Sequence, residues 1–348
     1  MFGCRDQNNN PVDWFVAYKL PKLPSSNPTG AGFMYADVNT VGGGWVRSPN
    51  DMNSQNQAIA FTLQQLYSYQ NQPDVFHLMY NDEKPCGDAF SSYNGHTKGV
   101  ILFDYTSGFW LVHSVPKFPS SQAYAYAKNG LYYGQSFLCI SMPYREMAPL
   151  GTQLLLYEPY IYSCTMPEGM DSANPDMKRV VSGYSISCSH HDTPYKQYTF
   201  YSSGGAKFIN FAKQRHYCRD IYCNFLAPQL GVSMAAETWQ HGRASSNFKC
   251  CCFSGNCVHN VNYIQLPGGI TFSIYKDHSK WAVSTDSNHP WVCIGGVNRQ
   301  HGQLRRGGGM MCLQHPQLWQ MYHNSVQNTI PQTCSNANTT TITACQNC

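Results

Sequence analysis

The chain has 348 residues, which is long enough for one large domain or two packed halves with a sizeable hydrophobic core. Asp, Glu, Lys and Arg make up only 12% of the residues, so the polar surface must come largely from Asn, Gln, Ser, Thr and Tyr. The sequence has no run of roughly 18 apolar residues, which argues against a transmembrane helix. No apolar signal segment follows Met1, so we expect any leader peptide to be missing from this chain.

The 13 histidines and 16 cysteines bear on where the protein works. Protonated histidines would add to the formal charge of +4 and favour polyanion binding in an acidic compartment; the alternative is that they titrate without functional consequence. So many cysteines indicate an oxidising environment and several disulfides. A zinc knuckle of Cys250–Cys252 with Cys257 and His259 is an alternative. The spacing lacks paired Cys-x2-Cys signatures, so we expect no metal site.

The first half of the chain predicts alternating helix and strand. Residues 12–18 are typical of a buried strand, and residues 51–68 carry apolar positions at helical spacing. Residues 75–80, 99–105 and 109–115 are predicted strands, the last two joined by a turn at Thr106-Ser107-Gly108.

The second half is predicted to begin after an aperiodic junction around residues 167–178. We expect helices at 205–214 and 225–230. Strands are expected at 232–239, 269–275 and 281–285. From residue 325 the chain is Asn- and Thr-rich and contains the glycosylation sequon Asn338-Thr339-Thr340. This mixture predicts α/β or α+β layers, with halves at 1–166 and 167–324 and a Cys/Thr-rich tail at 325–348.

A repeated motif is the strongest chemical signal. His96-Thr97-Lys98 is followed by a strand-like run to Asp104, and His278-Ser279-Lys280 by a similar run to Asp286. In each copy a turn and then a Trp follow. Residues i and i+2 of a strand share a face, so each His and its Lys can project together. Strand capping by the two histidines does not explain the doubled lysine.

Such a pair suits phosphodiester chemistry. Two lysines can stabilise the charge that grows on the phosphoryl oxygens without a metal ion. One imidazole can attack phosphorus to give a phosphohistidine, while the other protonates the leaving oxygen and later activates water. Because one histidine must start neutral and the other protonated, an acidic to near-neutral optimum is natural.

The arrangement resembles the phospholipase D superfamily, in which each half gives a His-Lys motif to one site. The wider sequence is most similar to the deoxyribonuclease II family. The N-terminal resemblance rests on Cys4-Arg5-Asp6, Pro11-Val12-Asp13-Trp14-Phe15-Val16 and Tyr18-Lys19-Leu20-Pro21. The first catalytic block is Gly95-His96-Thr97-Lys98-Gly99-Val100 with Gly108-Phe109-Trp110-Leu111-Val112-His113-Ser114-Val115-Pro116. The second is Asp277-His278-Ser279-Lys280-Trp281 with Trp291-Val292-Cys293, Asn298-Arg299 and Arg306-Gly307-Gly308-Gly309.

That resemblance implies an acid endonuclease that works without divalent metal or other cofactor and leaves 3′-phosphate ends. It implies a pseudo-two-fold, phospholipase D-like fold whose two sheet-plus-helix halves share one active site. It also places His113 in the site beside His96, Lys98, His278 and Lys280. By analogy His96 is the nucleophile and His278 the general acid, an order that the sequence alone does not give.

Three further residues are supporting candidates. Asp104 and Asp286 either orient the histidine rings or begin the turns that follow them, and we favour the turn role. Asn298 lies near the position where the superfamily places a phosphate-binding Asn, although its spacing differs between the halves.

The resemblance also implies the disulfides Cys4–Cys139 and Cys293–Cys312, and one that joins the 250–252 cluster to Cys334. The triple cysteine, Cys345 and Cys348 depart from the family pattern, so extra bridges or an intermolecular link are open. The family further implies a secreted or lysosomal protein.

The expected partner is double-stranded DNA, bound through phosphates without sequence preference and weakened by salt. Lys117-Phe118 and Arg305-Arg306 either line the groove or are ordinary surface. The oligomeric state is left open. A second hypothesis is a secreted toxin or host-interaction protein on the same scaffold, as in plancitoxin-like venom proteins. A third, a phospholipase D acting on lipid headgroups, is disfavoured because the long blocks match the nuclease family.

Overall fold

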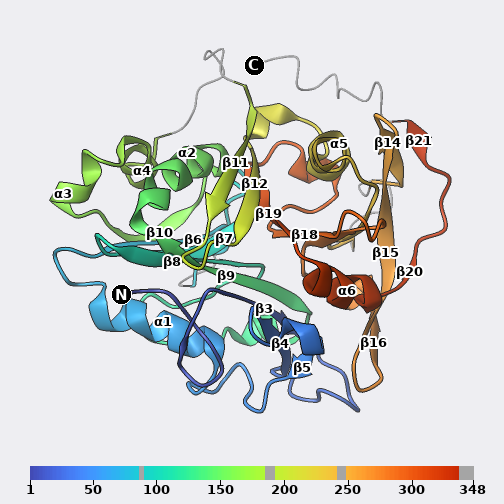
Figure 1. The fold of residues 1–348 in the computed structure, drawn as a ribbon, viewed down its shortest axis with the longest axis horizontal. Coiled ribbons are helices and arrows are strands. Elements are labelled where there is room, and N and C mark those ends of the chain that lie inside the picture. The colour runs from blue at the N-terminus through green and yellow to red at the C-terminus, as the bar shows by residue number, and fades with distance from the viewer. Residues whose placement is uncertain (86–89, 185–192, 241–247, 337–348) are drawn as a thin grey trace.

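Two large β-sheets dominate the molecule, which is a mixed α/β protein, as predicted (Figure 1). The structure is a computed structural model that describes residues 1–85, 90–184, 193–240 and 248–336. The sequon at Asn338 and the cysteines Cys345 and Cys348 lie outside these residues. None of the described helices is both long and apolar enough to cross a membrane.

The first sheet has eight strands in the order β10-β6-β7-β8-β9-β3-β4-β5. Its strands are β3 (Trp14–Lys19), β4 (Phe33–Asp37), β5 (Val46–Arg47), β6 (Phe76–Asn81), β7 (Lys98–Phe103), β8 (Ser107–His113), β9 (Gln135–Pro143) and β10 (Ile161–Thr165). The short pair β1 (Cys4–Arg5) and β2 (Pro11–Val12) precedes it. The predicted strands at 12–18, 75–80, 99–105 and 109–115 are thus confirmed.

Both faces of the first sheet are buried, because the side chains of each strand alternate between two cores. In β3, Phe15 and Ala17 face a core that includes α1 (Ala58–Tyr69), whereas Val16 and Tyr18 face a core shared with the second half. That shared core also contains residues of α2 (Met147–Tyr157) and α4 (Pro175–Val181), and the short α3 (Glu168–Asp171) lies beside α4. Figure 1 shows α1 and α2 on opposite sides of this sheet.

The second sheet runs in the order β11-β12-β19-β18-β17-β13-β15-β14-β21, with β16 and β20 also paired to β15. Its strands are β11 (Tyr195–Tyr201), β12 (Lys207–Lys213), β13 (Met234–Glu237), β14 (Cys251–Phe253), β15 (Asn256–Leu266), β16 (Ile270–Ser273), β17 (Trp281–Ser284), β18 (Trp291–Gly295), β19 (Gly308–Gln314), β20 (Val326–Thr329) and β21 (Ser335–Asn336). The helical segments are a π-helix at Tyr222–Leu226, α5 (Ala227–Leu230) and α6 (Pro316–Ser325).

The two sheets repeat one arrangement. The order β6-β7-β8-β9-β3-β4 of the first corresponds to β13-β17-β18-β19-β12-β11 of the second, and every neighbouring pair in both runs is antiparallel. The strands that follow the two His-x-Lys motifs, β7 and β17, hold the same place. This repeat fits the pseudo-two-fold architecture.

One element prediction was wrong, and one predicted helix starts later than expected. Residues 205–214 form the strand β12 and not a helix, because its side chains alternate and it fills the gap between β11 and β19. The helix expected at 51–68 begins only at Ala58, where the Gln57 side chain accepts hydrogen bonds from the amides of Ile59 and Ala60 and caps the helix. The helix at 225–230 is present as the end of the π-helix and α5.

The domain boundaries at 166/167 and 324/325 stay a prediction. Near the first, α4 packs against α2 of the preceding half. Beyond the second, β20 pairs with β15, and Cys334 is bonded to Cys250.

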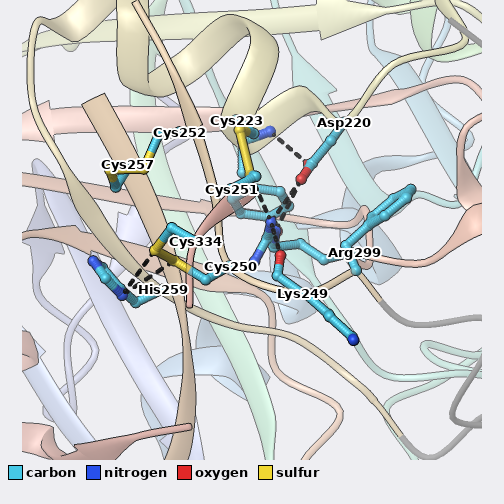
Figure 2. Close-up of a disulfide and its surroundings, with 12 residues drawn as sticks. Asp220, Cys223, Lys249, Cys250, Cys251, Cys252, Cys257, His259, Arg299 and Cys334 are labelled. Atoms are coloured by element: carbon cyan, nitrogen blue, oxygen red, sulfur yellow. Dashed lines mark hydrogen bonds and ion pairs between the residues drawn. A yellow bond between two sulfur atoms is a disulfide. The ribbon is translucent and has the colours of Figure 1, made fainter. Parts of the chain in front are cut away.

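Five disulfides join described residues, and three of them match the predicted pairs: Cys4–Cys139, Cys293–Cys312 and Cys250–Cys334. The other two are Cys223–Cys251 and Cys252–Cys257. Each of the three consecutive cysteines, Cys250 to Cys252, is therefore bonded to a different partner, as Figure 2 shows. The cysteines of the alternative zinc knuckle, Cys250–Cys252 and Cys257, are all used in disulfides, and His259 Nδ1 lies 3.3 Å from Cys250 Sγ.

Candidate active site

The two motif histidines are each held by the backbone of the opposite half. The His96 amide donates to the Gly307 carbonyl at 2.9 Å, and the His278 amide donates to the Gly134 carbonyl at 2.8 Å. Lys98 starts β7, and Lys280 immediately precedes β17. The two motifs therefore meet at the junction between the halves, at the starts of the corresponding strands β7 and β17.

The backbones at this junction approach so closely that only glycine fits. A Cβ at Gly296 would lie 2.6 Å from the His96 carbonyl oxygen, and one at Gly307 would lie 2.5 Å from the Tyr157 carbonyl oxygen. The carbonyl oxygen of Gly296 itself lies 2.5 Å from His96 Nδ1. Since a carbonyl can only accept, Nδ1 carries the proton and Nε2 of a neutral His96 keeps its lone pair.

Asp82, directly after β6, joins cationic groups from both halves. Its carboxylate accepts hydrogen bonds from Lys98 Nζ and, at 3.1 Å, from Arg306 Nη2, and it lies 3.9 Å from His96 Nε2. Burial alone raises the pKa of Asp82, but the charges of Lys98, His96 and Arg306 outweigh it and hold that pKa below its ordinary value. Asp82 is therefore ionised.

Arg306 is buried beside this carboxylate. Its guanidinium also donates to the carbonyls of Ser91, Asn94 and Gly95, at 2.7–3.2 Å. Arg306, which belongs to the second half, thus fixes the segment of the first half that leads into His96. Of the basic residues considered for a DNA groove, it lies inside the molecule, whereas Arg305 is exposed.

The His278 ring is enclosed by two aromatic side chains, Tyr133 and Trp239. Tyr133 stacks on it with centroids 4.1 Å apart and an interplanar angle of 6°, and Trp239 meets it edge-on at 3.9 Å. Burial, followed by the charges of Lys280 and Lys98, lowers the pKa of His278 to about 2. His278 Nε2 is buried without a hydrogen-bond partner among the described residues.

Burial and surrounding cations also govern His96 and Lys280. Burial is the main cause that places the pKa of His96 well below its ordinary value, with the charges of Lys98, Arg306 and Lys280 acting in the same direction against Asp82. Burial lowers the pKa of Lys280 to about 7, and the charge of Lys98 contributes. The pKa of His278 responds to the charge of His96 and that of His96 to Lys280, so the two motifs form one electropositive site.

A second group of polar side chains surrounds Asp277, the chain neighbour of His278. Asp277 accepts hydrogen bonds from Tyr18 Oη and, at 2.9 and 2.8 Å, from the amide and hydroxyl of Ser279. Glu237, the last residue of β13, is fully buried with neither carboxylate oxygen hydrogen-bonded among the described residues. Burial and the charge of Asp277 raise the pKa of Glu237 well above its ordinary value, so this carboxyl tends to be neutral.

His113 ends β8, one position beyond the paired residues Gly99 and Val112, so it lies next to Lys98 on the neighbouring strand. It is fully buried between Phe118 and Phe137, and its Nδ1 accepts the Val115 amide at 3.2 Å. Burial, helped by the Lys98 charge, lowers its pKa to about 3. His113 is therefore neutral, with the proton on Nε2.

The three supporting candidates lie elsewhere. Asp104 accepts from the amides of Thr106 and Ser107 at 2.7 and 2.8 Å, at the end of β7 opposite Lys98. Asp286 accepts from the Asn288 amide and His289 Nδ1 at 2.9 and 2.8 Å in the corresponding turn after β17. Asn298 Oδ1 accepts the backbone amide of Trp239 at 3.2 Å, so Asn298 holds the backbone of the residue whose ring packs on His278.

Sequence reasoning missed several residues of this site: Asp82, Tyr133, Trp239 and Glu237. None of them belongs to the repeated motif, and Tyr133 and Trp239 lie far along the chain from His278, whose ring they contact. A useful signal was the buried position of Asp82 at the end of an apolar strand, where an unpaired carboxylate is costly and a cation must be near.

The fold and this site define a mixed α/β protein of two sheet-containing halves that share one histidine–lysine centre. The family model described as Deoxyribonuclease II matches residues 3–332. Plancitoxin-1 from Acanthaster planci is 39% identical, over 95% of this chain and 92% of that protein. Deoxyribonuclease-2 from Caenorhabditis elegans is 37% identical, covering 92% of each chain, and Deoxyribonuclease-2-alpha from Mus musculus is 35% identical, covering 94% and 93%. The chain therefore belongs to the deoxyribonuclease II family and is a deoxyribonuclease.

Proposed function

We propose that this deoxyribonuclease is a metal-independent acid endonuclease that cleaves DNA through a phosphohistidine on His96 and leaves 3′-phosphate ends. The observation that carries the proposal is the reciprocal pinning of His96 and His278 by backbone from the opposite half, with Lys98 and Lys280 beside them. Two imidazoles fixed in this way provide a nucleophile and a proton donor, and two lysines provide the charge that phosphoryl transfer requires.

In the first step His96 Nε2 attacks phosphorus, and the bond from phosphorus to the 5′-oxygen breaks. The carbonyl of Gly296 holds the Nδ1 proton, so the lone pair of Nε2 is available. His278 gives its proton to the departing 5′-oxygen. In the second step neutral His278 takes a proton from water, whose oxygen attacks phosphorus and releases His96 and a 3′-phosphate.

The pKa values favour an acidic optimum. His278 has a pKa of about 2 because it is buried among cations, so a bound phosphodiester anion must raise that pKa before the ring can act as an acid. Lys280, with a pKa of about 7, is fully charged only at more acidic pH. Both effects increase positive charge where the phosphate binds as the pH falls.

His113 is proposed to orient the site through Lys98, its neighbour on β7, and to offer the substrate its Nε2 proton, which has no partner among the described residues. The turn positions of Asp104 and Asp286 favour a structural role for them, and Asn298 acts through Trp239. DNA binding is expected to be independent of sequence and to weaken with salt. The described disulfides favour a secreted or lysosomal location.

Plasmid cleavage in EDTA at about pH 5 tests this function. We expect the intact chain to convert supercoiled plasmid to nicked and linear forms, and His278→Ala to lose at least about 100-fold in rate because it lacks the proton donor. His289→Ala, which removes an exposed turn histidine, is the matched control and should retain full activity. An intact chain that leaves the plasmid uncut would overturn the proposal.

A toxin on the nuclease scaffold is the second candidate, since Plancitoxin-1 is among the relatives. The retention of both His-x-Lys motifs favours catalysis as part of any such role. Toxicity that persists in His278→Ala would instead indicate that binding alone carries the effect.

A further inference from the structure

An open groove adjoins the active site on the side of Tyr133. It has a volume of about 830 Å³ and lies where the segment after Leu20 meets the segments that precede Gly134 and Asp277. Three tyrosines line it, namely Tyr132, Tyr133 and Tyr275. Lys22 and Lys276 line it as well, together with two prolines. Tyr133 is also the ring that stacks on His278, so one side chain belongs to both the groove and the site.

The groove is a built feature of the junction between the two halves. The Lys22 amide donates to the Tyr132 carbonyl at 3.1 Å, and the Gly134 amide donates to the Lys276 carbonyl at 2.8 Å. Gly134 and Asp277 also form a parallel bridge. These bonds fix the backbone on which the tyrosine and lysine side chains stand, and the same Gly134 carbonyl holds the His278 amide.

The surface of the groove combines flat rings with positive charge. Tyr132 and Tyr275 are 61% and 55% exposed, far more than side chains that pack in a core. Lys22 and Lys276 are exposed, and no carboxylate is among the described residues that line the groove. The neighbouring Asp277 is buried and bonded to Tyr18 and Ser279, so it does not offset the two lysines at the surface.

We propose that this groove binds a short single-stranded segment of DNA next to the phosphodiester in the active site. Exposed aromatic rings stack on unpaired bases, and lysines contact the phosphates between them. The volume is in the range of roughly 300–1,000 Å³ that encloses small ligands, which suits a few nucleotides of one strand and not a duplex. The inference rests on the proposed function, because the strand is placed by the phosphodiester bound at His96 and His278.

Binding and small-substrate cleavage separate the groove from the site. Binding of a fluorescent oligothymidine of about 20 nucleotides is measured in a His96→Asn background, alongside a duplex of the same length. Tyr132→Ala and Tyr275→Ala should each weaken single-strand binding by about 5- to 150-fold, the range for loss of one stacked base. Lys22→Ala and Lys276→Ala should each lower the slope of log affinity against log salt by about 0.7.

Two controls keep the result specific. Tyr263→Ala and Lys196→Ala remove exposed residues of β15 and β11 and should leave single-strand affinity and salt slope unchanged. With His96 intact, the groove variants should hydrolyse bis(p-nitrophenyl) phosphate at the rate of the unmodified chain, because that substrate is too small to reach the groove.

Three outcomes in the groove variants would overturn the proposal. They are an unchanged affinity for the single strand, an affinity for the duplex that falls as much as that for the single strand, and small-substrate hydrolysis that falls together with binding. An unmodified chain that cleaves neither bis(p-nitrophenyl) phosphate nor DNA would instead contradict the proposed function. In that case the single-strand affinities still decide whether the groove binds single-stranded DNA.

Discussion

Asp82 carries negative charge into a site otherwise crowded with cations. Its carboxylate is fully buried and contacts Lys98 from its own half and Arg306 from the other half. A buried carboxylate is stable only when such partners compensate for its lost hydration. The same charge raises the pKa of His96 against the effect of burial, so Asp82 bears on both the fold and the nucleophile.

Asp82→Asn is expected to destabilise the protein by about 3 kcal/mol, because Lys98 and Arg306 would remain buried without their counter-charge. Since Asp82 raises the pKa of His96, its removal should also move the acid limb of the activity profile to lower pH. Urea unfolding and a pH–rate profile measure the two effects. Asp104→Asn is the control; it alters only a turn and should leave the profile in place. An unshifted limb in Asp82→Asn would contradict this role.

At this scale the sequence predicted His96, Lys98, His278 and Lys280 because they repeat at fixed spacing. It did not predict Asp82 or Trp239. Asp82 meets Arg306 across 224 positions, and the Trp239 amide bonds to Asn298 across 59, so only the folded backbone brings them together.

The segment after β18 links the cysteine-rich part of the second half to the active site. Gly296 contacts His96, and Asn298 supports Trp239, which packs on His278. Arg299 anchors the segment: its guanidinium donates to Asp220 and to the Lys249 carbonyl, and lies 3.1 Å from Cys251 Sγ (Figure 2). The disulfide cluster therefore stiffens the backbone on which Trp239 and His96 depend.

Asn298→Ala should lower kcat with little change in KM, because the Trp239 backbone amide loses its hydrogen-bond acceptor and the ring no longer encloses His278 firmly. With less burial the pKa of His278 should rise toward its ordinary value, so the limb that reports the general acid moves to higher pH. Steady-state kinetics across pH measures both. A structural role alone would predict a loss of about 1 kcal/mol in stability and no shift of the limb. Asn53→Ala, at an exposed turn, is the matched control.

Elements with a clear apolar period were predicted well, as β3, β6, β7 and β8 show. The helix prediction for residues 205–214 was wrong because KFINFAK has apolar residues that suit a short helix as well as a strand. Its neighbours β11 and β19, which are distant in sequence, decide the outcome by pairing with it along both edges.

The molecule buries both histidines and a carboxyl group, and their contributions to stability change with pH in opposite directions. Burial lowers the pKa of His77 to about 4, of His113 to about 3 and of His278 to about 2, each from 6.5. The unfolded chain therefore takes up protons first, and these histidines cost stability as pH falls below about 6.5. It also follows that they add little positive charge to the folded protein in mild acid, which corrects the expectation from the histidine count.

Glu237 acts in the opposite sense. Burial raises its folded pKa above 4.5, so the folded state holds a proton that the unfolded state releases, and stability is lost as pH rises above about 4.5. Glu237→Gln removes this loss. Its free energy of unfolding relative to the unmodified chain should therefore increase as pH rises from about 4.5 to 7, in urea unfolding at several pH values. Glu168→Gln, at an exposed position, should show no such trend. A flat difference for Glu237→Gln would contradict its buried, protonated state.

The central claim about the molecule is that its two halves together form a covalent bond between phosphorus and His96. The most direct test is to mix the protein with DNA in EDTA, quench in alkali within the first turnovers, and map phosphorylated peptides by mass spectrometry. We predict a phosphate adduct on the peptide that contains His96, and its accumulation in His278→Ala with a substrate whose leaving group needs no proton. An adduct on His278, or none on either histidine while DNA is being cleaved, would contradict the mechanism.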